Sequence, residues 1–508
     1  MNPTARPPIR WWPAAVILAV VAAVLAWIWL SDASHTQERV IDTFPTLFFG
    51  ALALVLWLVL FSRLPRRRRR NIALAVAAAV GLGFLLFDIQ GVDGNLVPIV
   101  GWRWGAGGTF DDPAATAAAA ATPRGDDYPQ FYGPRRDATL PGPRLARDWQ
   151  AQPPRELWRR EVGEAWSSFA VVGQAAVTQE QRGEDEAVVR YELESGRQVW
   201  VHTDRTLFST TIGGRGPRAT PTLAGGRVYT LGATGILNCL ELADGRRVWR
   251  RDVLADHGVE LPDWGLSSSP LVAGELVIVG LGRRGISLAA YDRRTGEPAW
   301  SAAGEAGSYS SPILATLAGR QQVLMVNQTS VAGHDPATGE RLWREEWADP
   351  GERITPPLVV DGDRFLVSAG YGVGSRLLRL VPEDGFRVEE LWESRRLKSK
   401  FAPVVLRDGV VYGLDDGVLV AVDLATGERR WKHGRYGHGQ LILVGDLLLI
   451  QAEAGELVLV EANAGEHREL ARLPALAEKT WNPPALAGRL LLVRNNREAV
   501  CYELPVEG

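Results

Sequence analysis

Aromatic, basic and amide side chains recur just before runs of β-forming residues, and together they could hold a polar or anionic ligand. The candidate ligand-binding face consists of Trp166, Glu180, Arg218, Trp264, Lys400, His438, Gln440 and Trp481. Arginine and lysine donate charge-assisted hydrogen bonds to anions, and tryptophan rings provide flat apolar walls. For any single residue the plainer interpretation is a structural role, with neighbouring Ser-Pro or Thr-Pro pairs capping a strand.

Residues that catalyse reactions or bind metals are scarce. The seven histidines show no ligand spacing, and the chain has two cysteines, Cys239 and Cys501. No Gly-x-Ser-x-Gly elbow and no phosphate-binding glycine loop occurs. Asp415-Asp416 could bind a cation, but Asp-Asp-Gly is commonly just a turn. We therefore expect no catalytic residue, no metal site and no cofactor.

A repeated phrase predicts the elements that position these residues. A short β-forming run, a polar turn ending in glycine and a tryptophan four residues later recur, as in Tyr191–Trp200 and Val422–Trp431. The repeat tryptophans are Trp158, Trp200, Trp249, Trp300, Trp343, Trp392 and Trp431. Their spacing of roughly 40 to 50 residues is typical of a β-propeller blade with four short strands. We expect the glycine to adopt a positive φ and the tryptophan to pack on the neighbouring blade.

The two ends of the repeat region complement each other. Trp158 lies in an outer-strand phrase without preceding inner strands, whereas 484–504 provides inner strands without an outer one. Pairing them completes a composite blade and predicts an all-β, eight-bladed propeller; seven blades, with the copy at Gly465 as an insertion, is the alternative. In such blades the loops before the first strand and between the second and third share one face, which gathers the candidate residues at the mouth of the central channel.

Three uncharged stretches at 11–30, 43–61 and 72–87 predict three transmembrane helices before the propeller, although the third is short. The first is too long for a cleaved signal peptide. Arg63 and Arg66–Arg70 lie between the second and third stretches. The positive-inside rule then predicts a cytoplasmic N-terminus and a periplasmic region after residue 87, anchored in the bacterial inner membrane.

This pattern divides the chain into a membrane anchor (1–88), a linker and docking segment (89–154) and the propeller (155–508). Within the linker, Asp93–Trp104 and Tyr128–Pro134 are too distinctive for a spacer, and we expect them to dock, the propeller being the candidate surface. The 56 basic and 59 acidic residues give a net charge of −3, which argues against nucleic-acid binding.

The repeat Asp-x-x-Thr-Gly-x-x-x-Trp, present at Asp292–Trp300, Asp335–Trp343 and Asp423–Trp431, resembles that of PQQ-like β-propellers. That family includes quinoprotein alcohol dehydrogenases and the outer-membrane assembly lipoprotein BamB. The resemblance covers roughly 155–505 and implies the fold, but the scaffold hosts both enzymes and binding proteins. The chain lacks the adjacent cysteine pair of the dehydrogenases and the lipid-anchor cysteine of BamB.

These observations favour a membrane-anchored periplasmic propeller that is a non-catalytic scaffold for a protein or a polar small molecule, with envelope assembly as one role. The alternative is a quinoprotein dehydrogenase that uses PQQ and calcium to oxidise an alcohol or a sugar.

Overall fold

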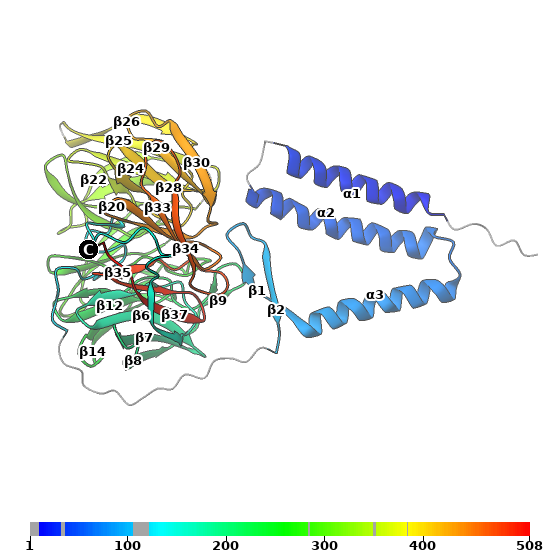
Figure 1. Cartoon of the computed structure of the whole chain (residues 1–508), viewed down its shortest axis with the longest axis horizontal. Coiled ribbons are helices and arrows are strands. Elements are labelled where there is room, and N and C mark those ends of the chain that lie inside the picture. Colours follow the sequence, from blue (N-terminus) through cyan, green and yellow to red (C-terminus); the bar gives the residue numbers. More distant parts are fainter. Residues whose placement is uncertain are drawn as a thin grey trace, which may run out of the picture. The chain divides into compact units, whose positions relative to one another are not determined.

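The computed structural model describes residues 10–31, 36–104, 121–282, 285–348, 352–383 and 385–507 (Figure 1). The chain divides into two compact units, Met1–Gly107 and Gly108–Gly508. Residues 105–120 of the predicted linker lie outside the described residues.

The first unit begins with three helices. They are α1 (Trp12–Leu30), α2 (Thr36–Leu56) with its π-helical extension η1 (Trp57–Phe61), and α3 (Arg66–Leu86). Each of the three is long and apolar enough to cross a membrane. The arginine run forms the first turn and a half of α3 rather than a loop, because arginine is a good helix former and Pro65 stands at the N-cap.

A β-hairpin follows α3 directly. Strands β1 (Phe87–Val92) and β2 (Pro98–Trp102) are antiparallel, and Phe87 faces Trp102 while Ile89 faces Val100. At the tip, the Asp93 carboxylate accepts the backbone N–H groups of Asn95 at 2.8 Å and Val97 at 2.9 Å. The phrase Asp93–Trp104 thus forms the tip and second strand of a hairpin that belongs to the first unit.

The second unit is built from antiparallel sheets whose four strands follow chain order. Figure 1 shows this β-rich unit, coloured along the chain. Six of these sheets are each formed by four consecutive strands; the first two contain β5 (Ala170–Val172), β6 (Ala175–Arg182), β7 (Asp185–Glu192) and β8 (Gln198–Arg205), and β11 (Thr222–Ala224), β12 (Arg227–Leu231), β13 (Ile236–Glu241) and β14 (Arg247–Asp252). The third and fourth contain β15 (Leu271–Ala273), β16 (Leu276–Gly280), β17 (Ile286–Asp292) and β18 (Pro298–Ala303), and β19 (Ile313–Leu317), β20 (Arg320–Val326), β21 (Ser330–His334) and β22 (Arg341–Glu346). The fifth and sixth contain β23 (Leu358–Val359), β24 (Arg364–Ala369), β25 (Gly374–Glu383) and β26 (Gly385–Ser394), and β27 (Val405–Arg407), β28 (Val410–Asp415), β29 (Val418–Asp423) and β30 (Arg429–Arg435). The connections add a small hairpin, β9 (Ser209–Thr210) with β10 (Gly214–Arg215), and a short helix, α4 (Val253–His257).

Two further sheets use strands from distant parts of the chain. One contains β31 (Gln440–Val444), β32 (Leu447–Gln451), β33 (Glu456–Glu461) and β34 (Glu469–Pro474), with β3 (Thr139–Leu140) parallel to β31. The other contains β35 (Ala485–Ala487), β36 (Leu490–Arg494), β37 (Glu498–Glu503) and, from the start of the repeats, β4 (Arg155–Glu161). Cys501 pairs with Trp158 in this composite sheet, so the predicted joining of the two ends is confirmed.

The repeat tryptophans link successive sheets. In five copies the indole lies on the turn glycine of the next sheet: Trp158 on Gly196, Trp200 on Gly245, Trp249 on Gly296, Trp300 on Gly339 and Trp392 on Gly427. These glycines have φ between +67° and +76°, and a Cβ would meet the ring within 2.8 Å. The same indoles donate to a carbonyl of that turn, as Trp200 does to Leu242 at 3.0 Å. Both expectations for the repeat are confirmed, and tryptophan packing holds the sheets together.

Trp343 departs from this pattern. Its indole donates to the Gln322 side chain of its own sheet at 2.5 Å. In the following sheet the β25–β26 hairpin is extended, and its turn glycine, Gly385, lies at the far end. A Cβ atom added to Gly385 would have no neighbour within 4 Å, so no indole packs on this glycine. Without a docking turn on the neighbour, the ring packs on Phe365 instead, with 5.3 Å between ring centroids.

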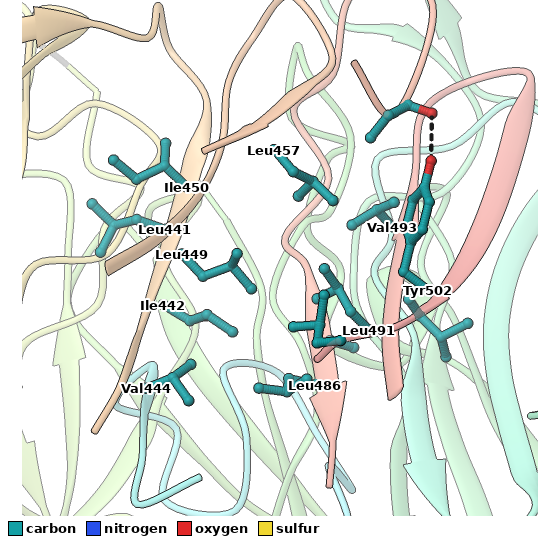
Figure 2. Packing of buried hydrophobic residues seen from close by; sticks show 14 of the residues in the cluster. Leu441, Ile442, Val444, Leu449, Ile450, Leu457, Leu486, Leu491, Val493 and Tyr502 are labelled. Carbon is teal, nitrogen blue, oxygen red and sulfur yellow. Dashed lines mark hydrogen bonds between the residues drawn. The ribbon is translucent and has the colours of Figure 1, made fainter. Parts of the chain in front are cut away.

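Apolar side chains fill the spaces between sheets. Figure 2 shows this packing where Leu441 and Ile442 of one sheet lie in a common cluster with Leu486, Leu491 and Val493 of the next. Cys239 and Cys501 are both free and buried in such clusters, as expected for small core residues.

Candidate functional site

Aromatic and basic side chains from several sheets meet on the loops that precede the first strands. We call this set the aromatic rim: Trp166, Trp264, Tyr309, Tyr371, Lys400, Phe401, His438, Lys479 and Trp481. All but Tyr371 stand in loops before a first strand, and Tyr371 stands between the second and third strands β24 and β25. The alternation of strand direction therefore brings them to one face, as strand order predicts.

Trp481 is the centre of one part of the rim. Its ring centroid lies 4.8 Å from that of Trp166 and 5.1 Å from that of Phe401. The Lys479 ammonium lies 4.1 Å from the Trp481 centroid and 4.7 Å from that of Trp166, within the range of cation–π attraction. The buried Asn482 amide donates to the carbonyls of Ala165 and Ser167, which fixes the Trp481 loop to the Trp166 loop.

The rim continues through Phe401. Its ring lies 5.8 Å from the His438 ring, and the Lys400 ammonium is 5.5 Å from Phe401 and 4.6 Å from Tyr371. His438 and Lys400 are each only 5% exposed, so they form the inner wall of the rim rather than its outer edge.

Trp264 and Tyr309 form the remaining part. Their rings are stacked with 5.1 Å between centroids and 26° between planes, and the Trp264 backbone N–H donates to the Tyr309 hydroxyl. Burial, the Glu352 carboxylate and Tyr309 all raise the pKa of Tyr371. The rim therefore consists of a row of contacts from Trp166 through Trp481, Phe401 and Lys400 to Tyr371, and of the separate pair Trp264 and Tyr309 on the same face.

Glu453, which the sequence analysis missed, organises the rim. One carboxylate oxygen accepts the Trp481 indole N–H at 2.7 Å, and the other accepts the His438 backbone N–H at 2.9 Å. Gly437 has φ +64°, and a Cβ there would come within 2.6 Å of the Glu453 side chain. Glu453 lies between β32 and β33, a second-to-third-strand loop, so its place on this face could have been found from strand order.

Arg218 holds a loop in place, and its guanidinium group uses its donors within the protein. Its guanidinium donates to the carbonyls of Gly213, Gly214 and Gly216, and lies over the Phe208 ring at 4.3 Å. Burial lowers the pKa of Arg218 to about 10. The Gly213 carbonyl also accepts the Trp166 indole N–H at 2.8 Å, so Arg218 acts on the rim through this loop.

Glu180 and Gln440 also face the protein interior. Glu180 is fully buried and accepts from Tyr191 at 2.6 Å, and from Arg182 and the Gly163 backbone N–H at 3.0 Å each. Gln440 donates to the Trp481 carbonyl at 3.0 Å and accepts from the Tyr132 hydroxyl at 3.1 Å. These two predicted ligand contacts instead hold neighbouring segments in place.

Two exposed apolar side chains extend the rim. In the described part of the second unit, Ile212 (46% exposed) and Leu261 (43%) are the exposed large apolar residues. They lie in the two longest connections between sheets, which meet where the Phe208 ring approaches Gly265. Exposed apolar residues that are confined to one face mark a surface for interaction.

The segment 124–140 lies against the inner strands. The Tyr128 backbone pairs with Val171, and the Pro129 carbonyl accepts the Leu223 N–H. Arg136 is buried and donates to the carbonyls of Ser269 and Pro270 at 2.9 Å. The phrase Tyr128–Pro134 thus belongs to a segment that joins several sheets near their innermost strands.

The acidic pair Asp415-Asp416 is engaged in ion pairs with lysines. Asp415 accepts from the ammonium groups of both Lys398 and Lys432, which neutralise it. Among the described residues, no three His, Cys, Asp or Glu side chains are grouped to hold a metal ion.

The sheet order and the tryptophan packing define a β-propeller with PQQ-like repeats. A sequence model of the family described as "Outer membrane protein assembly factor BamB" matches residues 142–261, 184–433 and 389–504. The match extends over more than half of the chain, and the chain belongs to this family.

Individual relatives agree with this assignment. The chain is 27% identical over 314 residues to outer membrane protein assembly factor BamB of Burkholderia pseudomallei (strain K96243), covering 57% of this chain and 74% of the relative. BamB from Moraxella catarrhalis matches in structure with a TM-score of 0.52 and 16% identity, covering 69% of this chain and 100% of that one. Quinohemoprotein alcohol dehydrogenase from Comamonas testosteroni matches with a TM-score of 0.57 and 15% identity, covering 77% and 82%. At such identities the structural likenesses show the fold alone.

Proposed function

We propose that this protein is a membrane-anchored, non-catalytic binding scaffold. In this proposal the second unit is a closed propeller of eight blades on the periplasmic side of the inner membrane. The composite sheet supports closure, since its first strand β35 contacts β5 of the next sheet. The three apolar helices support the anchor, and the arginine run supports the orientation.

The aromatic rim is the proposed binding surface, and its partner is a protein segment. The observation that carries this proposal is the exposure of Ile212 and Leu261 beside the rim, on a unit whose other described large apolar side chains are buried or only partly exposed. Protein interfaces combine such apolar residues with aromatic anchors and basic groups. Trp481 and Lys479 supply this combination at the centre of the rim.

Family membership supports a role in envelope assembly. The relative from B. pseudomallei is named an outer membrane protein assembly factor. We extend that role to this chain as a scaffold that holds a client or partner protein from the inner-membrane side.

Site-specific photo-cross-linking in cells tests the binding surface. A benzophenone amino acid at position 212 or 261 is expected to give the same adduct, whereas the exposed Ser195 turn at the other end of the sheets gives none. The Lys479→Ala, Trp481→Ala double variant is expected to lower the yield roughly tenfold or more, because aromatic anchors contribute about 2 kcal/mol or more to interfaces. Equal adducts at 195, or a yield that the double variant leaves unchanged, would refute the proposal.

A titration with PQQ and Ca²⁺ tests the enzymatic alternative. Tryptophan fluorescence and reduction of an artificial electron acceptor are followed together. We expect no saturable quenching of tryptophan fluorescence and no reduction of the acceptor. Cooperative thermal unfolding of the same sample shows that the protein is folded. Saturable quenching with turnover would make this protein a dehydrogenase.

A further inference from the structure

The β1–β2 hairpin has one entirely apolar face. Directly opposed residues of an antiparallel pair share a face, and the register pairs Phe87 with Trp102 and Ile89 with Val100. These four side chains are 45%, 51%, 51% and 60% exposed in the order Phe87, Trp102, Ile89, Val100. A two-stranded hairpin is only marginally stable alone in water, so this face needs a partner.

The hairpin is fixed to the end of α3. The Phe87 N–H donates to the Gly83 carbonyl, and the Arg103 N–H donates to the Leu86 carbonyl at 3.0 Å. The first and last residues of the hairpin region are therefore both hydrogen-bonded to the last turn of α3. This turn lies at the end of the helix opposite Arg66–Arg70.

The whole of α3 is long enough to cross a bilayer, but its uncharged part is shorter than the hydrocarbon core. This part runs from Ile72 to Leu86, and its 15 residues span about 22 Å at 1.5 Å per residue, against a hydrocarbon core of roughly 30 Å. With the arginine run at the headgroups, about 8 Å of hydrocarbon thickness is left at the end where the hairpin begins.

The composition of the hairpin suits the boundary between lipid and water. Tryptophan prefers this layer, and Trp102 stands on the apolar face. Asp88 lies on the opposite face and forms an ion pair with Arg103 at 3.6 Å. Asp93 closes the tip, so the charged residues Asp88, Asp93 and Arg103 lie apart from the four apolar side chains.

We propose that the β1–β2 hairpin lies in the interfacial layer of the bilayer, with Phe87, Ile89, Val100 and Trp102 against the lipid chains. There it completes the third span and holds the start of the linker at the membrane surface. This inference rests on the proposed membrane anchor, and its partner is the lipid bilayer rather than a protein.

A depth measurement on the full chain in nanodiscs, one copy per disc, tests this proposal. Single cysteines at Val100→Cys and Ile89→Cys carry an environment-sensitive fluorophore, and nitroxide-labelled lipids quench it. Cys239 and Cys501 stay unlabelled, because both are buried and burial raises their pKa values to about 11 and about 12. Ala78→Cys within α3 reports the anchor, and Ser195→Cys on the second unit is the aqueous control.

We expect the labels at 89 and 100 to be quenched about twofold more by a nitroxide near the headgroups than by one deep in the chains. The label at 78 shows the reverse order, and the label at 195 is quenched by neither. Quenching at 78 without quenching at 89 and 100 would overturn the hairpin proposal and leave the anchor standing. No quenching at any of the three sites would overturn both. Labels at 89 and 100 shielded from lipid and from aqueous iodide alike would show that protein covers this face, which also overturns the proposal.

Discussion

Glu186 offers a sharp test of the packing between two neighbouring sheets. It is the second residue of β7 and only 7% exposed, and its carboxylate accepts the Ala233 backbone N–H at 3.1 Å. Burial raises its pKa from 4.5 to about 7, with Asp204 also raising it and Arg218 opposing. The folded protein therefore holds this proton at a pH where the unfolded chain has lost it.

The sign of the effect on stability follows from this difference. Below pH 4.5 the Glu186 carboxyl is protonated in both the folded and the unfolded state. There its contribution to the free energy of unfolding has its full stabilising value. As the pH rises from 4.5 to about 7 that contribution is lost. With about 1.4 kcal/mol for each pH unit, the free energy of unfolding should fall by about 2 to 3 kcal/mol between pH 5 and 8 because of Glu186 alone.

The assay compares the wild-type chain with Glu186→Gln by urea unfolding at several pH values. Glutamine keeps an oxygen acceptor for the Ala233 N–H but does not titrate. Other titrating groups contribute equally to both proteins, so the difference between the two curves isolates Glu186. A difference that stays constant from pH 5 to 8 would refute the raised pKa and the reasoning from burial.

Two matched pairs of substitutions test other parts of the fold by the same unfolding measurement. Gly296→Ala brings a methyl group within 2.7 Å of the Trp249 ring at φ +76° and should lower the free energy of unfolding by about 2 to 5 kcal/mol. Gly304→Ala, at φ +90° with open space around the new methyl group, should lower it by only about 1 to 2 kcal/mol. Equal losses of stability would contradict the role of tryptophan packing. Arg136→Ala removes the side-chain donor to the buried Ser269 carbonyl and one of the two donors to the Pro270 carbonyl, and it should cost about 1 to 3 kcal/mol. Arg135→Ala, with a side chain 60% exposed, should change stability by less than about 0.5 kcal/mol. Similar effects of the two substitutions would contradict docking of segment 124–140.

The repeat made most of the second unit predictable. The turn glycine and the tryptophan lie four residues apart in the regular copies, and their contacts repeat from one sheet to the next. Trp343 could not be placed correctly from its own copy, since its position depends on the long β25–β26 hairpin of the neighbouring sheet. The local pattern therefore predicts a contact only when the adjoining copy is regular.

The candidate site was predictable in position but not in the direction of its side chains. Strand order identified the face, and the structure brings Trp166, Lys400, His438 and Trp481 together there through Phe401 and Lys479. Arg218 turns inward to the carbonyls of its own loop, and Glu180 on β6 accepts a hydrogen bond from Tyr191 on the neighbouring strand β7. Such choices depend on distant backbone that sequence spacing does not encode.

The composite sheet has a consequence for how the chain reaches its folded state. Arg155 and Glu503 pair across 348 residues, so β4 is synthesised long before its partners β35–β37 exist. Until then β4 is an unpaired edge, which can join other chains. Contacts of such separation form slowly, because a long loop must close first. Chain synthesis thus sets the earliest moment of completion, and the interval before it is when this protein most needs protection from aggregation.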